Sequence, residues 1–493
     1  MTDRGPFAPS LSVSAAAWGV AITVFLALRL AVLTQAPVSG PELDSLSGAW
    51  LASVGEDDSR FLGTIFQALS SILLELDDSD TLPRLLAFLA TGTVPISFWL
   101  CRKQLGEGGA ILGMLVLAVD PTALFLGATA WQAAHDQALA AFILVVALKG
   151  THSRSVLAAV GFGVATGGTL ALGISLSIAA GHLLAGASLR SRSAVSVAAG
   201  IAAGVAVSSL GFGLVSTELR VPPFDLMNQG LESSWSTMTT VEILTLYELP
   251  VILAGAAAAT YRATQWYTGH PPDRADRVLL GWAAFGLAHV IVARNSGDPS
   301  AILALVFPLT AIIGRAAAEI ALEADLSWLR RPEDGRVARS AGTVGAAVIG
   351  SAALLVLVSG TFNIARGSSG EPLLSPGSPP GSSALRATVL ALAADTDRDI
   401  VIHPSLREDT TWPLRGMGAV IVASRFSELE AVVIWPTDED TPPGYARSVK
   451  EADLVRRVEP PEGGLNGIID WFRDRNRVNT NGVQVAVYTG QTP

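Results

Sequence analysis

Cysteine and charge are both scarce in this sequence. Its 493 residues include one cysteine, Cys101, so the chain has no internal disulfide framework and no metal centre built on several cysteines. Only 15% of the residues are charged, whereas soluble domains carry about 25%. The GxxxxGK[ST] phosphate loop, the HExxH motif and the CxxC pair are absent. A formal charge of −10 argues against nucleic-acid binding, which requires a basic surface.

Long apolar runs take the place of the missing charge. Half of the residues are hydrophobic, and the mean hydropathy is +0.46. Because a helix needs about 20 mostly apolar residues to cross a bilayer, the sequence predicts about eleven transmembrane helices. These candidate spans lie near 14–35, 83–101, 108–126, 131–148, 155–172, 173–189, 194–216, 241–261, 277–293, 299–321 and 340–363. The fold class expected is a polytopic α-helical membrane protein.

Basic residues alternate between the loops. Lys and Arg accumulate in the cytoplasmic loops of membrane proteins. Every second loop is basic here, at 102–103, 149–154, 190–192, 262–277 and 315–339. We therefore place the N-terminus inside and the C-terminal tail outside. Within the spans, glycines four residues apart, such as Gly200 and Gly204, predict close helix packing.

The first external loop, residues 36–82, is long and acidic. Within it, apolar residues recur at helical spacing from Phe61 to Leu76. This pattern predicts an amphipathic helix that lies at the outer interface of the membrane.

The chain changes composition after the last span. Residues 1–366 form the predicted transmembrane domain, and residues 367–384 are a Gly/Ser/Pro-rich linker. Residues 385–493 then contain short apolar strands at 399–404, 418–424, 431–436 and 482–490, with helices at 385–395 and 464–477. Residues 446–459 fit either a helix or a strand. We expect a small extracytoplasmic α/β domain, because about 110 residues can hold a core of their own.

Polar residues that could carry chemistry gather on the predicted external face. Glu42 and Asp44 follow the first span directly, and His135 and Asp136 begin the fourth. Carboxylates at these positions suit a general base or a ligand of a divalent cation. Three arginines on that face, Arg60, Arg84 and Arg294, suit a phosphate because of their planar donor groups. An acid at a helix start is also an ordinary N-cap, so that alternative stays open for Asp136.

The order of these features resembles the GT-C superfamily of integral-membrane glycosyltransferases, in particular its protein O-mannosyltransferase and aminoarabinose-transferase branch. The likeness rests on Glu42/Asp44, the amphipathic helix, Pro83-Arg84, Asp120-Pro121 and Asp136. In the tail, Thr411–Arg415, WFRDRN and VQVAVYTG are similar to the flippase-associated, GT-C-like family of prokaryotes.

The resemblance implies a sugar transferase in a prokaryotic cytoplasmic (inner) membrane that uses a polyprenyl-phosphate-linked donor on the outer face. It implies that Asp44 is the general base or lies beside the metal and the acceptor, with Glu42 as its substitute. It implies that Asp136 binds Mg²⁺ or Mn²⁺ directly or supports the residues that do. Arg60, Arg84 and Arg294 would contact the donor phosphate. The acceptor would be a lipid, a glycan or a protein. The candidate residues for contact with the acceptor or with a partner are His135, Trp412 and Arg415. The more common alternative for Trp412 and Arg415 is a core tryptophan beside a surface arginine.

Two other functions remain open at this point. In the family the first-loop acids are usually adjacent, whereas here Leu43 separates them. A non-catalytic GT-C-like scaffold, which binds lipids or other membrane subunits of the cell envelope, would show the same pattern. A transporter is the third alternative, although the sequence has no clear internal repeat.

Overall fold

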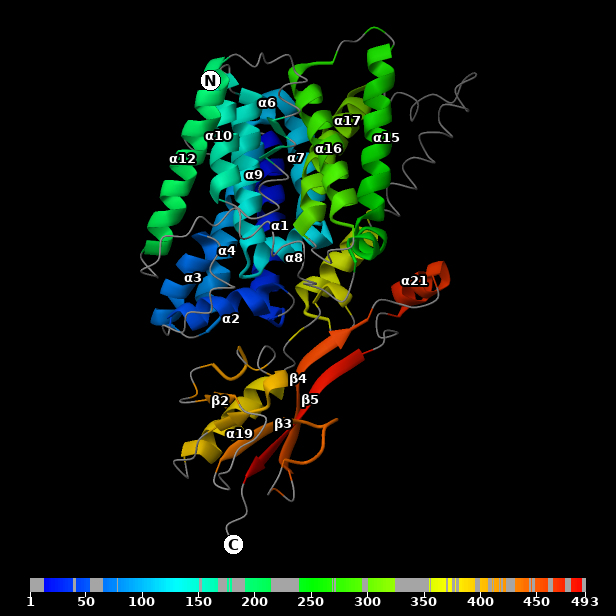
Figure 1. The fold of residues 1–493 in the computed structure, drawn as a ribbon. Coiled ribbons are helices and arrows are strands. Elements are labelled where there is room, and N and C mark those ends of the chain that lie inside the picture. The colour runs from blue at the N-terminus through cyan, green and yellow to red at the C-terminus, as the bar shows by residue number, and fades with distance from the viewer. Residues whose placement is uncertain are drawn as a thin grey trace, which may run out of the picture.

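The computed structural model consists of a bundle of long helices, with a mixed β-sheet beyond one end of it (Figure 1). It describes residues 13–38, 41–53, 65–77, 79–149, 153–166, 191–213, 239–267, 272–294, 300–323, 356–368, 371–374, 381–394, 400–406, 412–415, 420–422, 431–442, 448–459, 464–474 and 480–489, and the single positions 175, 176, 178, 179, 269, 354, 377, 410, 417 and 445.

The bundle is formed by the helices before residue 366. They are α1 (Val13–Gln35), α2 (Pro41–Ser53), α3 (Ile65–Leu76), α4 (Thr81–Thr91), α5 (Thr93–Leu100), α6 (Arg102–Leu105), α7 (Glu107–Ala118), α8 (Pro121–Ala128), α9 (Gln132–Lys149), α10 (Ser153–Thr166), α12 (Ser191–Gly213), α14 (Thr240–Ile243), the π-helix Leu244–Glu248, α15 (Leu249–Tyr267), α16 (Arg274–Val292) and α17 (Ser300–Glu323). A further apolar helix covers Val356–Ala365.

Five helical segments of the described chain are long and apolar enough to cross a membrane. They are Val13–Gln35, Thr81–Leu100, Thr240–Tyr267, Arg274–Val292 and Ala301–Ile320, and each coincides with a predicted span. The bent pair α7–α8 would make a sixth. Helices α9, α10 and α12 lie where further spans were predicted, and the region 173–189 falls almost entirely outside the described residues. The total of eleven and the orientation of the chain stay predictions.

The predicted span 108–126 is not one straight helix. Helices α7 and α8 meet at an angle of 73° around Val119 and Asp120. Pro121 cannot continue the hydrogen-bond pattern of α7, since it has no backbone N–H. Asp120 has an extended backbone and accepts the N–H of Ala123 at 2.7 Å, so it begins α8 as an N-cap.

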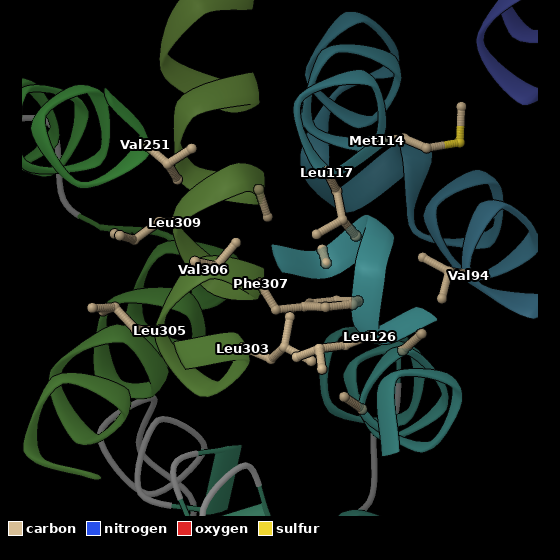
Figure 2. Packing of buried hydrophobic residues seen from close by; sticks show 14 of the residues in the cluster. Val94, Met114, Leu117, Leu126, Val251, Leu303, Leu305, Val306, Phe307 and Leu309 are labelled. Atoms are coloured by element: carbon tan, nitrogen blue, oxygen red, sulfur yellow. The ribbon is translucent and has the colours of Figure 1, made fainter. Parts of the chain in front are cut away.

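Helix α17 is the most deeply buried of the candidate spans. In Figure 2, Leu303 and Phe307 on α17 point toward Leu126 of α8. Phe307 also stacks on Trp282 of α16, with 5.4 Å between the ring centroids. Helices α7, α8 and α16 are therefore held around one central helix.

Glycines allow helices α10 and α12 to touch, as the sequence predicted for Gly200 and Gly204. A Cβ at Gly200 would lie 2.0 Å from the Ala158 carbonyl oxygen, and one at Gly204 would lie 2.5 Å from the Ala165 Cβ. Since neither distance is sterically possible, the backbones can approach this closely only without side chains.

The described part of the chain after the bundle forms a five-stranded sheet, two α-helices and two short 3₁₀ helices. The elements are a 3₁₀ helix (Pro372–Leu374), α19 (Gly381–Ala394), β1 (Ile400–Ile402), a second 3₁₀ helix (Pro404–Leu406), β2 (Val420–Val422), β3 (Val432–Pro436), β4 (Ser448–Val458), α21 (Gly464–Arg473) and β5 (Thr480–Thr489). The strand order is β2-β1-β3-β5-β4, with β1 parallel to β2 and β3, and β5 antiparallel to β3 and β4. All four predicted strands occur, and the ambiguous stretch 446–459 is β4.

The sheet region packs against the bundle in two places. Ala130, Ala134 and residues of α2 share one hydrophobic cluster with Leu385 and Val389 of α19. Elsewhere the Trp471 ring of α21 meets the edge of the Tyr247 ring, with 5.7 Å between the centroids. The predicted linker also contains a buried segment, because Pro372, Leu373 and Leu374 are apolar and pack inward.

Candidate functional site

Glu42 and Arg84 form a buried ion pair at the start of the first external segment. Glu42 is 0% exposed and Arg84 is 3% exposed. Nε and one terminal nitrogen of Arg84 donate to the two carboxylate oxygens of Glu42, each at 2.7 Å. This is the two-pronged geometry that makes arginine–carboxylate pairs strong.

The same pair connects four parts of the chain. The other terminal nitrogen of Arg84 donates to the carbonyl oxygens of Ala36 at 2.8 Å and Leu33 at 3.3 Å, at the end of α1. Glu42 also accepts the backbone N–H of Ala130 at 2.7 Å. All three guanidinium nitrogens of Arg84 thus donate to acceptors inside the protein, and the pair fixes α1, α2 and α4 to the turn before α9.

Asp44 lies on α2, a helix at a position where the sequence predicted only loop. Its neighbours Leu43 and Leu46 pack with Ala130 and Ala134 in one hydrophobic cluster. The first turn of α2 therefore lies beside the turn that begins α9. The two acidic positions Asp44 and Asp136, 92 residues apart in the sequence by their numbers, are on neighbouring elements.

Asp136 is almost fully buried in α9, with 2% of its surface exposed. One carboxylate oxygen accepts the side-chain amide of Gln132 at 2.9 Å. Asp136 is not the N-cap of α9, because the helix begins four residues earlier at Gln132. Nε2 of His135, the residue before it, is buried and makes no hydrogen bond to the described residues.

The remaining predicted site residues lie apart from this group. Arg294 is exposed just beyond the end of α16, and Arg60 falls outside the described residues. Trp412 is 3% exposed and belongs to the hydrophobic cluster that includes α19. The Arg415 guanidinium covers the Trp412 ring at 3.9 Å and donates to its carbonyl oxygen at 3.0 Å. Trp412 is thus a core side chain in this fold, and Arg415 is the more accessible of the two.

A bound divalent cation would need several oxygen or nitrogen ligands from the protein. Within the described ranges, no three His, Cys, Asp or Glu side chains gather in a way that could hold one. The described residues therefore do not form a metal centre by themselves, and Asp136 as a metal ligand stays a prediction.

Two groups of charged residues received no role from the sequence. Arg262 of α15 pairs with Asp276 of α16 at 2.8 Å and with Glu319 of α17. Arg29, Asp120 and Glu248 are each 0% exposed inside the bundle. A signal for them was present, since a charged residue inside an apolar run usually has a specific partner.

Comparison with known proteins gives a fold but no sequence family. No protein-family model matches the sequence, and no curated protein sequence matches it. Among solved structures, ArnT from Cupriavidus metallidurans bound to undecaprenyl phosphate matches with a TM-score of 0.56 at 14% identity. The match covers 97% of this chain and 98% of that one. ArnT from the same organism in the apo state gives a TM-score of 0.55, also at 14% identity. The chain therefore has the fold of ArnT along nearly its whole length, as the resemblance to the aminoarabinose-transferase branch predicted.

Proposed function

We propose that the protein is a membrane glycosyltransferase that moves a sugar from a polyprenyl-phosphate-linked donor to an extracytoplasmic lipid, glycan or protein acceptor. The observation that carries this proposal is the similarity of fold, along 97% of the chain, to a structure that holds undecaprenyl phosphate. Several apolar spans support a place in a prokaryotic cytoplasmic membrane. The sheet region then lies outside the cytoplasm, as the basic loops predict.

Asp44 is the residue to which we assign the role of general base. It follows the first span by a few residues, so it lies at the height where a lipid phosphate meets the aqueous phase. The helix that carries it packs against the start of α9, which brings Asp136 to the same end of the bundle. Two acids on adjacent elements at this level suit the binding and activation of an acceptor hydroxyl.

Glu42 and Arg84 have a positioning role in this proposal. Their ion pair is closed on all sides by protein groups, and it fixes the first turn of α2 two residues before Asp44. Contact with the donor phosphate is then assigned to Arg60 and Arg294. Arg294 is exposed at the end of α16. His135 and Arg415 remain candidates for contact with the acceptor or a partner subunit.

The reaction is a single displacement at the sugar. The acceptor hydroxyl oxygen bonds to the anomeric carbon as the bond from that carbon to the phosphate oxygen breaks. Asp44 takes the hydroxyl proton, and polyprenyl phosphate leaves with the electron pair, so the configuration inverts. A requirement for Mg²⁺ or Mn²⁺ stays a prediction, and these steps do not depend on a metal ion.

The proposal is tested by the Asp44→Asn variant of the purified full chain. Undecaprenyl phosphate carrying one of a panel of labelled sugars is supplied, and the released undecaprenyl phosphate is measured by mass spectrometry. Loss of a general base lowers the rate about 10²–10⁴-fold. Glu75→Gln, an exposed acid of the same external segment, is the matched control and keeps the wild-type rate.

A scaffold without catalytic activity is the second candidate. The observation in its favour is that Glu42 and Arg84, both part of the resemblance to the family, bind each other and the backbone. If wild-type protein binds undecaprenyl phosphate but transfers no sugar from the panel, the scaffold replaces the transferase. If Asp44→Asn keeps full activity, the transferase stands but Asp44 loses its role.

A further inference from the structure

Three charged side chains lie inside the bundle, apart from the site described above. Arg29 comes from α1, Asp120 from the N-cap of α8, and Glu248 from the last position of the π-helix Leu244–Glu248. All three are 0% exposed. Ionisable groups at such positions are costly, so in membrane proteins they mark functional sites more often than not.

The local structure directs these side chains toward one another. The Asp120-Pro121 bend ends α7 and presents the first turn of α8 to the bundle interior. A π-helix, a rare element that is frequent at functional sites, carries Glu248. Because Gly127 has no side chain, it leaves room for the Arg29 guanidinium. A Cβ at this position would lie only 3.2 Å from Arg29 Nε.

The hydrogen bonds of this cluster are incomplete. Asp120 uses one oxygen to accept the Ala123 N–H, and Arg29 donates weakly to the Ala123 carbonyl oxygen at 3.4 Å. In the described part of the chain, the other Asp120 oxygen, both Glu248 oxygens and the Thr122 hydroxyl make no well-aligned hydrogen bond, although Glu248 lies close to both Asp120 and Thr122. Buried polar atoms without partners are rare in proteins, and each one calls for a water, an ion or a proton.

The two carboxyl groups interact directly with each other, and the charge of Arg29 acts on Asp120. Carboxylates only accept hydrogen bonds, so two ionised groups in contact repel unless a positive species lies between them. With both carboxylates ionised, Arg29 balances one of them and the cluster retains one negative charge. A single added positive charge makes the cluster neutral, whereas a divalent ion would leave one excess positive charge next to Arg29.

We propose that Asp120 and Glu248 form a buried binding site for one monovalent cation, either a proton or an alkali-metal ion such as Na⁺. The two carboxylates supply the negative charge, the Thr122 hydroxyl supplies a further oxygen, and Arg29 limits the occupant to one positive charge. The site does not depend on the glycosyl-transfer function proposed above.

The occupant stabilises contacts beyond the cluster, because the preceding residue of the π-helix faces the tail. The Tyr247 hydroxyl donates to a Glu371 carboxylate oxygen at 2.8 Å and accepts the Leu373 N–H at 3.3 Å. Among the described residues, Glu371, Arg29, Asp120 and Glu248 are the buried charged groups around this segment. Helix α21, which packs on Tyr247 through Trp471, adds Asp470 and Arg473. Loss of the cation leaves Glu248 charged against Asp120 and weakens the π-helix that holds the tail.

The test is thermal unfolding of the detergent-purified full chain, with Glu248→Gln as the diagnostic variant. A glutamine supplies its own N–H to Asp120 and therefore needs no cation. Midpoints are measured from about pH 6 to pH 9, in NaCl and in choline chloride at equal ionic strength. Glu75→Gln, the same substitution at an exposed position, is the control and follows the wild type.

The difference in thermal unfolding midpoint between wild type and Glu248→Gln shows whether the site binds a cation and which one. If the occupant is a proton, the folded state holds a proton that the unfolded chain has released. Wild-type stability then falls by a few degrees relative to the variant as the pH rises, in either salt. If the occupant is Na⁺, replacing choline chloride with NaCl raises the midpoint of the wild type but not that of the variant. A difference that changes with neither pH nor Na⁺ overturns the proposal.

Discussion

Truncation of Arg84 to alanine removes one half of the buried pair that fixes α2. Glu42 then remains 0% exposed and keeps the Ala130 N–H as a donor, but it has lost the positive charge that balanced it. A buried charge left without its partner costs about 3–5 kcal/mol. The Ala36 and Leu33 carbonyl oxygens also lose their side-chain donor, at about 1 kcal/mol for each hydrogen bond. We expect the free energy of unfolding to fall by about 4 kcal/mol or more.

Most of this loss comes from the uncompensated carboxylate, so a second substitution should recover part of it. Glu42→Gln removes the charge and keeps an oxygen that can accept the Ala130 N–H. The double variant Glu42→Gln/Arg84→Ala is therefore expected to be more stable than Arg84→Ala alone, by about 2 kcal/mol. Buried charge–charge coupling of this kind appears as non-additivity in a double-mutant cycle.

Unfolding by denaturant in detergent, followed by tryptophan fluorescence, measures the four free energies. Arg102→Ala is the control, because Arg102 is on the bundle surface and covers the Trp99 ring at 4.1 Å. Its loss should cost about 1 kcal/mol or less. The ion-pair explanation fails if Arg84→Ala costs no more than this control, or if Glu42→Gln makes Arg84→Ala still less stable.

Two further predictions concern other parts of the bundle. At Asp273, burial raises the pKa of the carboxyl, but hydrogen bonds from Arg315 and from the first turn of α16 lower it more, so the net pKa is below its ordinary value. A lowered folded-state pKa stabilises the protein above about pH 4, and the stabilisation disappears as the pH falls through that pKa. Thermal midpoints should hence drop less steeply in acid for Asp273→Asn than for wild type. Gly200→Leu should force α10 and α12 apart and cost about 1–3 kcal/mol, whereas Gly19→Leu, with nothing within 4 Å, should leave the unfolding midpoint unchanged.

The sequence predicted those features whose physical cause is local. Apolar length indicated the five long spans, and short apolar runs between turn residues indicated β1, β2, β3 and β5. The glycine spacing in α12 correctly predicted close packing for this helix, because the steric rule applies to the helix itself, but its partner α10 is known only from the fold. The predicted span 108–126 ran through Asp120-Pro121 as one helix, because the 73° bend at this point depends on what α8 packs against.

The site was less accessible to sequence reasoning, because its contacts join distant positions. Nothing in either local segment indicates that Arg84 binds Glu42 rather than a phosphate. Helix α2 was missed since Glu42, Asp44 and several small residues give it a weak apolar pattern. In the sequence, Arg29 and Glu248 are each a single charge within an apolar run, and only the folded bundle brings them to Asp120.

The proposed transferase requires that a polyprenyl phosphate binds at the end of the bundle where Asp44 and Asp136 lie on neighbouring elements. An experimental density map of the full chain with undecaprenyl phosphate added would test this requirement. We expect density for the phosphate next to the first turn of α2, with the Asp44 carboxylate facing an open path for the acceptor. Phosphate density elsewhere, or an Asp44 side chain turned to solvent away from the lipid, would contradict the proposed site.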